Sequence, residues 1–218
     1  MKRLAAGLIF GSFMGWAGIA AAQATPDPPS RSDDWDKVTT VTAVAAGLSS
    51  VLMPRVFYAN PEVTEGWKGR WHVSVLAPVM TQVGLTLLNE YKLKDGFQGP
   101  RPGCPDELGS SGCTTYGMMS THSYFAFQSL GHGAAVFLFD TTKHSAGRFN
   151  GGAFAGHVAT PLVLSVITGI GRGVGDWETG GQIFAGGAAG LGLGFLTGMT
   201  YALMQRPMCG YSGALICW

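Results

Sequence analysis

The sequence predicts an all-α protein, an integral membrane bundle of about six helices, made of an N-terminal signal peptide or anchor and five further spans. Only 12% of its 218 residues are charged, whereas a soluble domain carries about 25%. The mean hydropathy is +0.21, and the apolar residues gather in blocks of about 20, the length that crosses a bilayer. The net charge of +1 excludes a nucleic-acid partner, which requires a strongly basic face.

Residues 1–22 have the features of a secretory signal. Lys2 and Arg3 precede an apolar run that ends in three alanines, Ala20 to Ala22. We favour cleavage near Ala22, although the run is long enough to stay as an uncleaved anchor. Residues 23–38, rich in Pro, Ser and Asp, are predicted to be an exported linker, because they cannot bury enough apolar surface to order themselves.

The five further spans form a predicted helical membrane domain over residues 39–204, followed by a short tail, 205–218. Each span is close to the ~20 residues that cross ~30 Å of hydrocarbon. Their predicted ranges are 39–57, 72–91, 122–140, 153–171 and 181–204.

Glycines recur at every fourth position of the last span, at Gly186, Gly190, Gly194 and Gly198. This spacing places them on one stripe of a helix, where a neighbouring helix can approach closely. A phosphate-binding glycine loop would need a strand and a turn before the helix, which this apolar segment does not offer. We therefore expect a packing role, and we also allow for helix–helix self-association.

The distribution of basic residues predicts the orientation. If the N-terminal segment enters from the cytoplasm, eight Lys and Arg residues lie in cytoplasmic loops and six in exported ones. This bias favours a bacterial inner membrane protein whose loops 92–121 and 171–180 face the periplasm.

Those two loops carry the candidate phosphate-binding cations, Lys94, Arg101 and Arg172. The span between them opens with Ser120, Thr121 and His122. A helix N-terminus offers free N–H groups and a positive dipole end to an anion. Arginine binds phosphate in a bidentate manner, and a histidine at the rim could protonate a leaving oxygen. The alternative is that these are ordinary loop charges and capping hydroxyls.

The spacing of these residues resembles that of the type-2 phosphatidic acid phosphatase superfamily, which includes the vanadium haloperoxidases. Lys94, six residues, then Arg101-Pro102 reproduces its first signature, and Met119-Ser120-Thr121-His122 resembles the second, Pro-Ser-Gly-His. The third signature is Ser-Arg, five residues, His, three residues, Asp. At those places this chain has Gly171, Arg172, Glu178 and Gln182.

The resemblance implies the membrane lipid-phosphatase branch, hydrolysing or binding a lipid phosphate or polyprenyl pyrophosphate at the periplasmic face. It implies phosphate binding by Lys94, Arg101, Ser120, Thr121 and Arg172, with His122 as general acid. Glu178 stands where the family has its nucleophile. It could form an acyl phosphate, but we favour a counter-ion to the arginines, since a carboxylate repels phosphate. The alternative function is an inactive member that binds phospholipid headgroups or scaffolds a membrane assembly.

The cysteines and the remaining histidines predict no metal and no cofactor. Cys104 and Cys113 lie in the exported loop, where an oxidising compartment favours a disulfide. The tail cysteines, Cys209 and Cys217, lack two further metal ligands. His132 and His157 fall about 9 Å apart in predicted depth by the helical rise, so they do not suit a haem.

Overall fold

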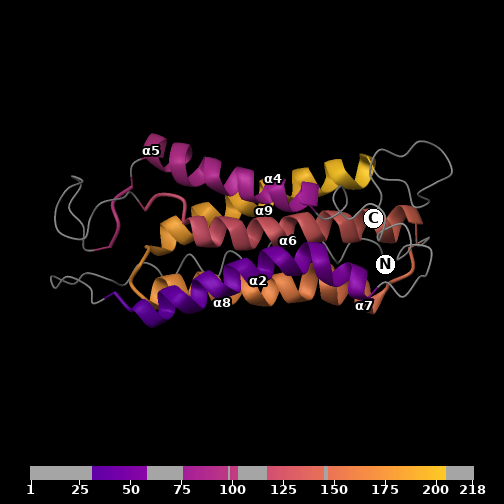
Figure 1. The fold of residues 1–218 in the computed structure, drawn as a ribbon, viewed down its shortest axis with the longest axis horizontal. Coiled ribbons are helices and arrows are strands. Elements are labelled where there is room, and N and C mark those ends of the chain that lie inside the picture. The colour runs from indigo at the N-terminus through magenta and orange to yellow at the C-terminus, as the bar shows by residue number, and fades with distance from the viewer. Residues whose placement is uncertain (1–30, 58–75, 98, 103–116, 145–146, 205–218) are drawn as a thin grey trace.

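The computed structural model describes residues 31–57, 76–97, 99–102, 117–144 and 147–204, which contain five long helical segments and no strand. Three of these segments include π-helical turns, labelled η. The segments are α2 (Asp33–Phe57); α4 (Ala77–Leu88) with η3 (Asn89–Leu93) and α5 (Lys94–Phe97); α6 (Thr121–Phe139) with η4 (Asp140–His144); α7 (Gly151–Phe154) with η5 (Ala155–Ala159) and α8 (Thr160–Val174); and α9 (Gly180–Met204). They run lengthwise through one elongated bundle, with α5 at one end and α7 at the other (Figure 1). The predicted all-α class is confirmed.

Helix α2 begins earlier than predicted. It starts at Asp33 rather than at residue 39, so the end of the predicted linker is helical. The cause is local, because Asp33, Asp34 and Asp36 lie in the first turn, where carboxylates interact favourably with the positive end of the helix dipole. The Ser32 hydroxyl also accepts a hydrogen bond from the backbone N–H of Trp35 at 3.5 Å.

Two helical segments of the described residues, 151–174 and 180–203, are long and apolar enough to cross a membrane by length and composition. The full set of about six spans stays a prediction. The signal peptide or anchor, the tail and the predicted Cys104–Cys113 disulfide lie outside the described residues.

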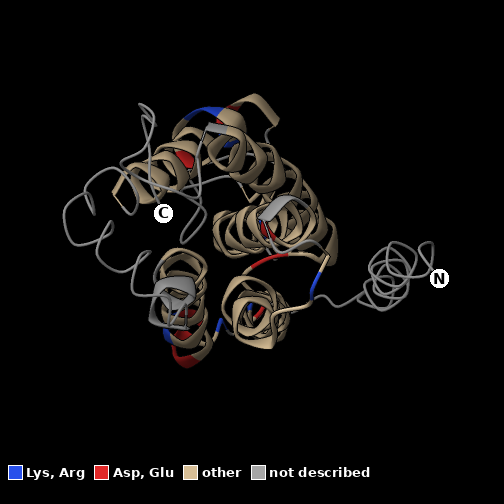
Figure 2. Ribbon diagram, turned by 90° about the vertical axis from the view of Figure 1, so that its right-hand side faces the viewer, with Lys and Arg blue, Asp and Glu red and all other residues tan. Residues whose placement is uncertain are grey.

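Burial in the bundle is the reverse of that in a soluble protein. Large apolar side chains are exposed along the outer faces of the helices, among them Val41, Met80, Val163 and Leu196 at 57 to 66% exposure. Polar side chains are buried in the interior beside apolar ones such as Tyr124 and Leu130, and they include Gln82, Gln128, Ser129, His132 and Ser165. Charged residues are sparse along the helices (Figure 2). An apolar outside with polar groups inside, of which Gln82, Ser129 and Ser165 bond across helices, suits a surrounding of hydrocarbon.

The glycine stripe packs α9 against α6, and the predicted close approach is confirmed. A Cβ built on Gly190 would lie 2.2 Å from the carbonyl oxygen of Tyr124, and one on Gly194 would lie 2.0 Å from that of Gln128. Gly186 and Gly198 meet Ser120 and His132 in the same way, at 2.5 Å. Four glycines of α9 therefore match the N-cap of α6 and three residues within it, each spaced by one turn.

The helices are staggered along the bundle, and this corrects the predicted depths of the two histidines. A Cβ on Gly133 of α6 would lie 2.0 Å from the carbonyl oxygen of His157, so His157 lies level with the neighbour of His132. Ser165 of α8 donates to the carbonyl of Ala126 at 2.8 Å, although the two residues lie at different distances from their helix ends. Counting from span edges therefore misplaced His157.

Candidate functional site

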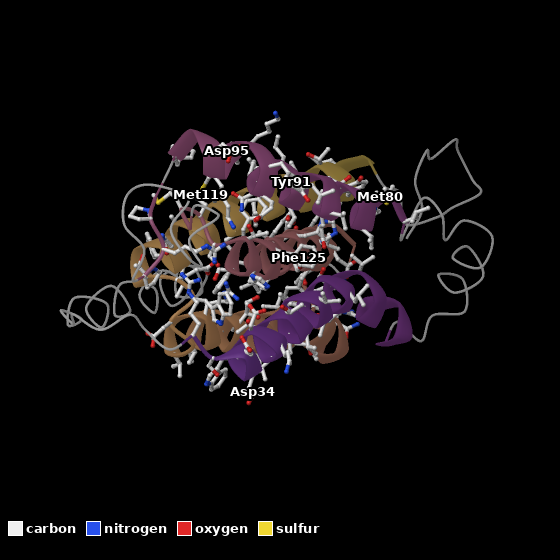
Figure 3. All side chains as sticks on the ribbon, turned by 60° about the vertical axis from the view of Figure 1, so that its left-hand side comes forward. Asp34, Met80, Tyr91, Asp95, Met119 and Phe125 are labelled. Carbon is white, nitrogen blue, oxygen red and sulfur yellow. The ribbon has the colours of Figure 1, made fainter. Side chains whose placement is uncertain are left out.

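The candidate site is a cluster of charged and polar side chains at the end of the bundle where α5 lies. Met119, directly before the α6 region, lies toward this end (Figure 3). Arg101 interacts electrostatically with Glu178, Arg172, Arg31 and Glu90, and His122 does so with Arg172, Glu178, Asp36 and Lys94. The structure thus brings the two predicted loops together.

Lys94 is buried, at 4% exposure, and forms an ion pair within its own helical segment. Its Nζ lies 2.7 Å from Oε2 of Glu90, one turn earlier. The Thr121 hydroxyl donates to the same carboxylate oxygen and accepts from Nδ2 of Asn89 at 3.3 Å. Two predicted phosphate-binding groups, Lys94 and Thr121, are thus engaged by Glu90. Sequence reasoning missed Glu90, although its i, i+4 spacing to Lys94 is a signal for such a pair.

Arg172 is held by two carboxylates. Its Nε and Nη2 donate to the two oxygens of Glu178, each at 3.3 Å, and its Nη1 donates to Oδ1 of Asp36 at 2.5 Å. Arg172 is 2% and Glu178 3% exposed. A bidentate buried contact of this kind is what the counter-ion interpretation of Glu178 predicts. Asp36 was missed because it falls in the predicted linker.

Trp177 links the start of α2 to the loop between α8 and α9. The guanidinium carbons of Arg31 and Arg172 lie 5.4 Å and 5.2 Å from the centre of its ring, which is within cation–π range. Its Nε1 donates to the carbonyl of Ser32 at 3.0 Å, and the N–H of Ser32 donates to Gly175 at 3.2 Å.

Gly171 lies against helix α2 with no room for a side chain. A Cβ at this position would lie 2.5 Å from a side-chain carbon of Thr39 and 2.9 Å from the ring of Trp35. Helix α2 therefore occupies the space that a side chain at residue 171 would need.

Ser120 and His122 sit at the start of α6. The fully buried Ser120 is the N-cap, since its hydroxyl accepts from the N–H of Ser123 at 3.2 Å and donates to the Ser123 hydroxyl at 3.0 Å. This is the capping role that the alternative interpretation expects. Nε2 of His122 lies 3.0 Å from the hydroxyl of Thr40.

Gln182, at the place of the family's aspartate, has a structural role. The side-chain oxygen of Gln182 accepts from the backbone N–H of Thr179 at 2.8 Å, and the backbone N–H of Gln182 donates to the Thr179 hydroxyl at 3.3 Å. This is the reciprocal capping box of a helix N-terminus. Its Nε2 donates to the carbonyl of Pro100 at 2.6 Å, which ties the segment carrying Arg101 to α9.

Arg101 is the most accessible of the three predicted cations, because it is half-buried whereas Lys94 and Arg172 are buried. Burial lowers the pKa of Arg101, and the carboxylate of Glu178 opposes this effect. A guanidinium stays charged regardless. An anion reaching the cluster would therefore meet Arg101 first.

Among the described residues, no group of three or more His, Cys, Asp or Glu side chains is placed to hold a metal ion. Comparisons with family models, with curated proteins and with solved structures found no match.

Proposed function

We propose that this protein is a membrane-embedded relative of the type-2 phosphatidic acid phosphatases that binds the phosphate headgroup of a lipid without hydrolysing it. The observation that carries the proposal is the buried contact of both Glu178 oxygens with Arg172. The residue at the nucleophile position is thereby engaged as a counter-ion. A phosphohistidine cannot form there, because residue 178 is not a histidine.

The cations of the cluster can attract an anion individually. Arg31, Lys94, Arg101 and Arg172 lie with the carboxylates Asp36, Glu90 and Glu178, and Asp176 belongs to the same loop as Glu178. The cluster is thus nearly balanced in charge, and its attraction for an anion depends on which guanidinium is accessible. Arg101, half-buried, can present a planar pair of donors to phosphate oxygens.

The reversed burial pattern supports placing the bundle in a bilayer. The positive-inside bias supports a bacterial inner membrane with the cluster facing the periplasm. The ligand would be a phospholipid or polyprenyl phosphate, whose headgroup reaches this end of the bundle while its chains lie against the apolar outer faces.

The first test measures orthovanadate binding and phosphate release by the full chain in detergent. We expect vanadate binding and no release of phosphate from phosphatidic acid or polyprenyl pyrophosphate. Arg101→Ala should weaken vanadate binding by about 1.5 to 3 kcal/mol, through loss of a charge-assisted hydrogen bond. Arg148→Ala is the matched control, since Arg148 is exposed and lies between η4 and α7 at the other end of the bundle.

Three results would contradict this proposal. Phosphate release that Glu178→Gln abolishes would make Glu178 a nucleophile and the protein a hydrolase. Equal vanadate binding by wild type, Arg101→Ala and Arg148→Ala would show that Arg101 does not contact the anion. Absence of vanadate binding altogether would leave the scaffolding role.

The orientation has its own test in the tail cysteines, Cys209 and Cys217. If the cluster faces the periplasm, the tail is cytoplasmic after an even number of crossings from the cytoplasm. An impermeant thiol reagent, added to cells with a permeabilised outer membrane and an intact inner membrane, should label neither cysteine. Labelling of either one before the inner membrane is lysed would invert the topology.

A further inference from the structure

Asp36 and Glu178 hold Arg172 in different ways. The Glu178 side chain is 1% exposed, whereas the Asp36 side chain is 39% exposed and reaches Arg172 from a different helix. Asp36 contacts only Nη1, while Glu178 contacts Nε and Nη2. Asp36 is therefore the partner that an incoming anion can replace without uncovering the buried pair.

The start of α2 is attached to the end of α8 and to the loop between α8 and α9 by hydrogen bonds and by ring contacts. These are the Trp177 to Ser32 and Ser32 to Gly175 hydrogen bonds and the stacking of Arg31 on Trp177. Trp35 of the first turn also packs beside Gly171 and Gly175, and the fully buried residues of α2 begin at Thr39. The backbone of the first turn is thus held in place, and the partly exposed Asp36 side chain is the part that can turn away from Arg172.

We propose that Asp36 is a displaceable carboxylate that competes with anions for Arg172, its side chain turning toward solvent while α2 stays packed in the bundle. This inference rests on the proposed anion-binding function. A phosphate oxygen accepts the same charge-assisted hydrogen bond from Nη1 that the Asp36 carboxylate accepts. Departure of Asp36 also raises the net positive charge of the cluster by one, which strengthens its attraction for the incoming anion.

The test compares orthovanadate affinity among variants of the full chain in detergent. Asp36→Asn keeps the shape of the side chain and removes its charge, so it should bind vanadate about tenfold more tightly than wild type. Asp34→Asn is the matched control, because Asp34 is 94% exposed and its ion-pair contact is with Lys37 at 3.7 Å. Its affinity should stay within about twofold of wild type, as expected for a surface pair.

The outcomes separate the two proposals. Vanadate binding that is the same in wild type, Asp36→Asn and Asp34→Asn would overturn the competition by Asp36 while leaving anion binding intact. Vanadate binding by Asp36→Asn but not by wild type would show that the Asp36 carboxylate excludes the anion from Arg172. Failure of both wild type and Asp36→Asn to bind vanadate, with each shown to be folded by a cooperative thermal transition, would overturn both proposals.

Discussion

A Gly194→Ala protein should be clearly less stable than wild type, whereas Gly192→Ala on the same helix should not. The new Cβ at residue 194 would lie 2.0 Å from the backbone carbonyl oxygen of Gln128, and a backbone atom cannot turn aside as a side chain can. Helices α6 and α9 would have to separate, which would also loosen the contacts of the other three glycines of the stripe. Overpacking of this kind costs about 1 to 3 kcal/mol.

Gly192 provides a control with the same chemical change. A Cβ there has no other atom within 4 Å, and alanine is favoured over glycine in a helix interior by about 1 kcal/mol. Thermal unfolding in detergent, followed by circular dichroism, should therefore give a lower midpoint for Gly194→Ala and an unchanged or higher midpoint for Gly192→Ala. Equal midpoints would mean that α9 does not contact α6 through this stripe.

The elements that could be predicted are those encoded by local patterns. Apolar length predicted α6, the segment formed by α7, η5 and α8, and α9 to within a few residues. The four-residue glycine spacing predicted the tight α6–α9 contact. The start of α2 was misjudged, because composition alone treats Asp33 to Asp36 as a polar linker and ignores the stabilisation of acidic residues in a first turn. The depth of His157 was misjudged because stagger between helices is set by tertiary packing.

The residues of the candidate site were likewise predictable only where the sequence carries a local pattern. The cations were identifiable from their spacing, since Lys94, Arg101 and Arg172 stand at motif positions. Asp36 was not identifiable, because its ion pair with Arg172 joins residues 136 positions apart and leaves no local pattern. Glu90 was missed although its i, i+4 spacing to Lys94 is a local signal. Gln182 was read only as a departure from the motif, although Thr179 three residues before it forms a recognisable capping box.

Arg172→Gln should be the most destabilising change in the cluster, and adding Glu178→Gln should restore most of the lost stability. The single variant leaves the Glu178 carboxylate, 3% exposed, without its bidentate partner. Breaking a buried ion pair from one side typically costs about 3 to 5 kcal/mol, because an uncompensated charge stays buried. The double variant removes both charges and keeps two side chains that can hydrogen-bond.

The four proteins of this cycle, compared by chemical unfolding in detergent, measure the coupling directly. A loss in the double variant equal to the sum of the single losses would show that the two side chains do not interact. Lys37→Gln is the surface control, because the Lys37–Asp34 pair is 76% and 94% exposed and should contribute no measurable stability. The double variant also separates fold from function. Its stability is restored but Arg172 is absent, so it should still bind vanadate more weakly than wild type. If Arg172 served only the fold, the double variant would bind vanadate as tightly as wild type.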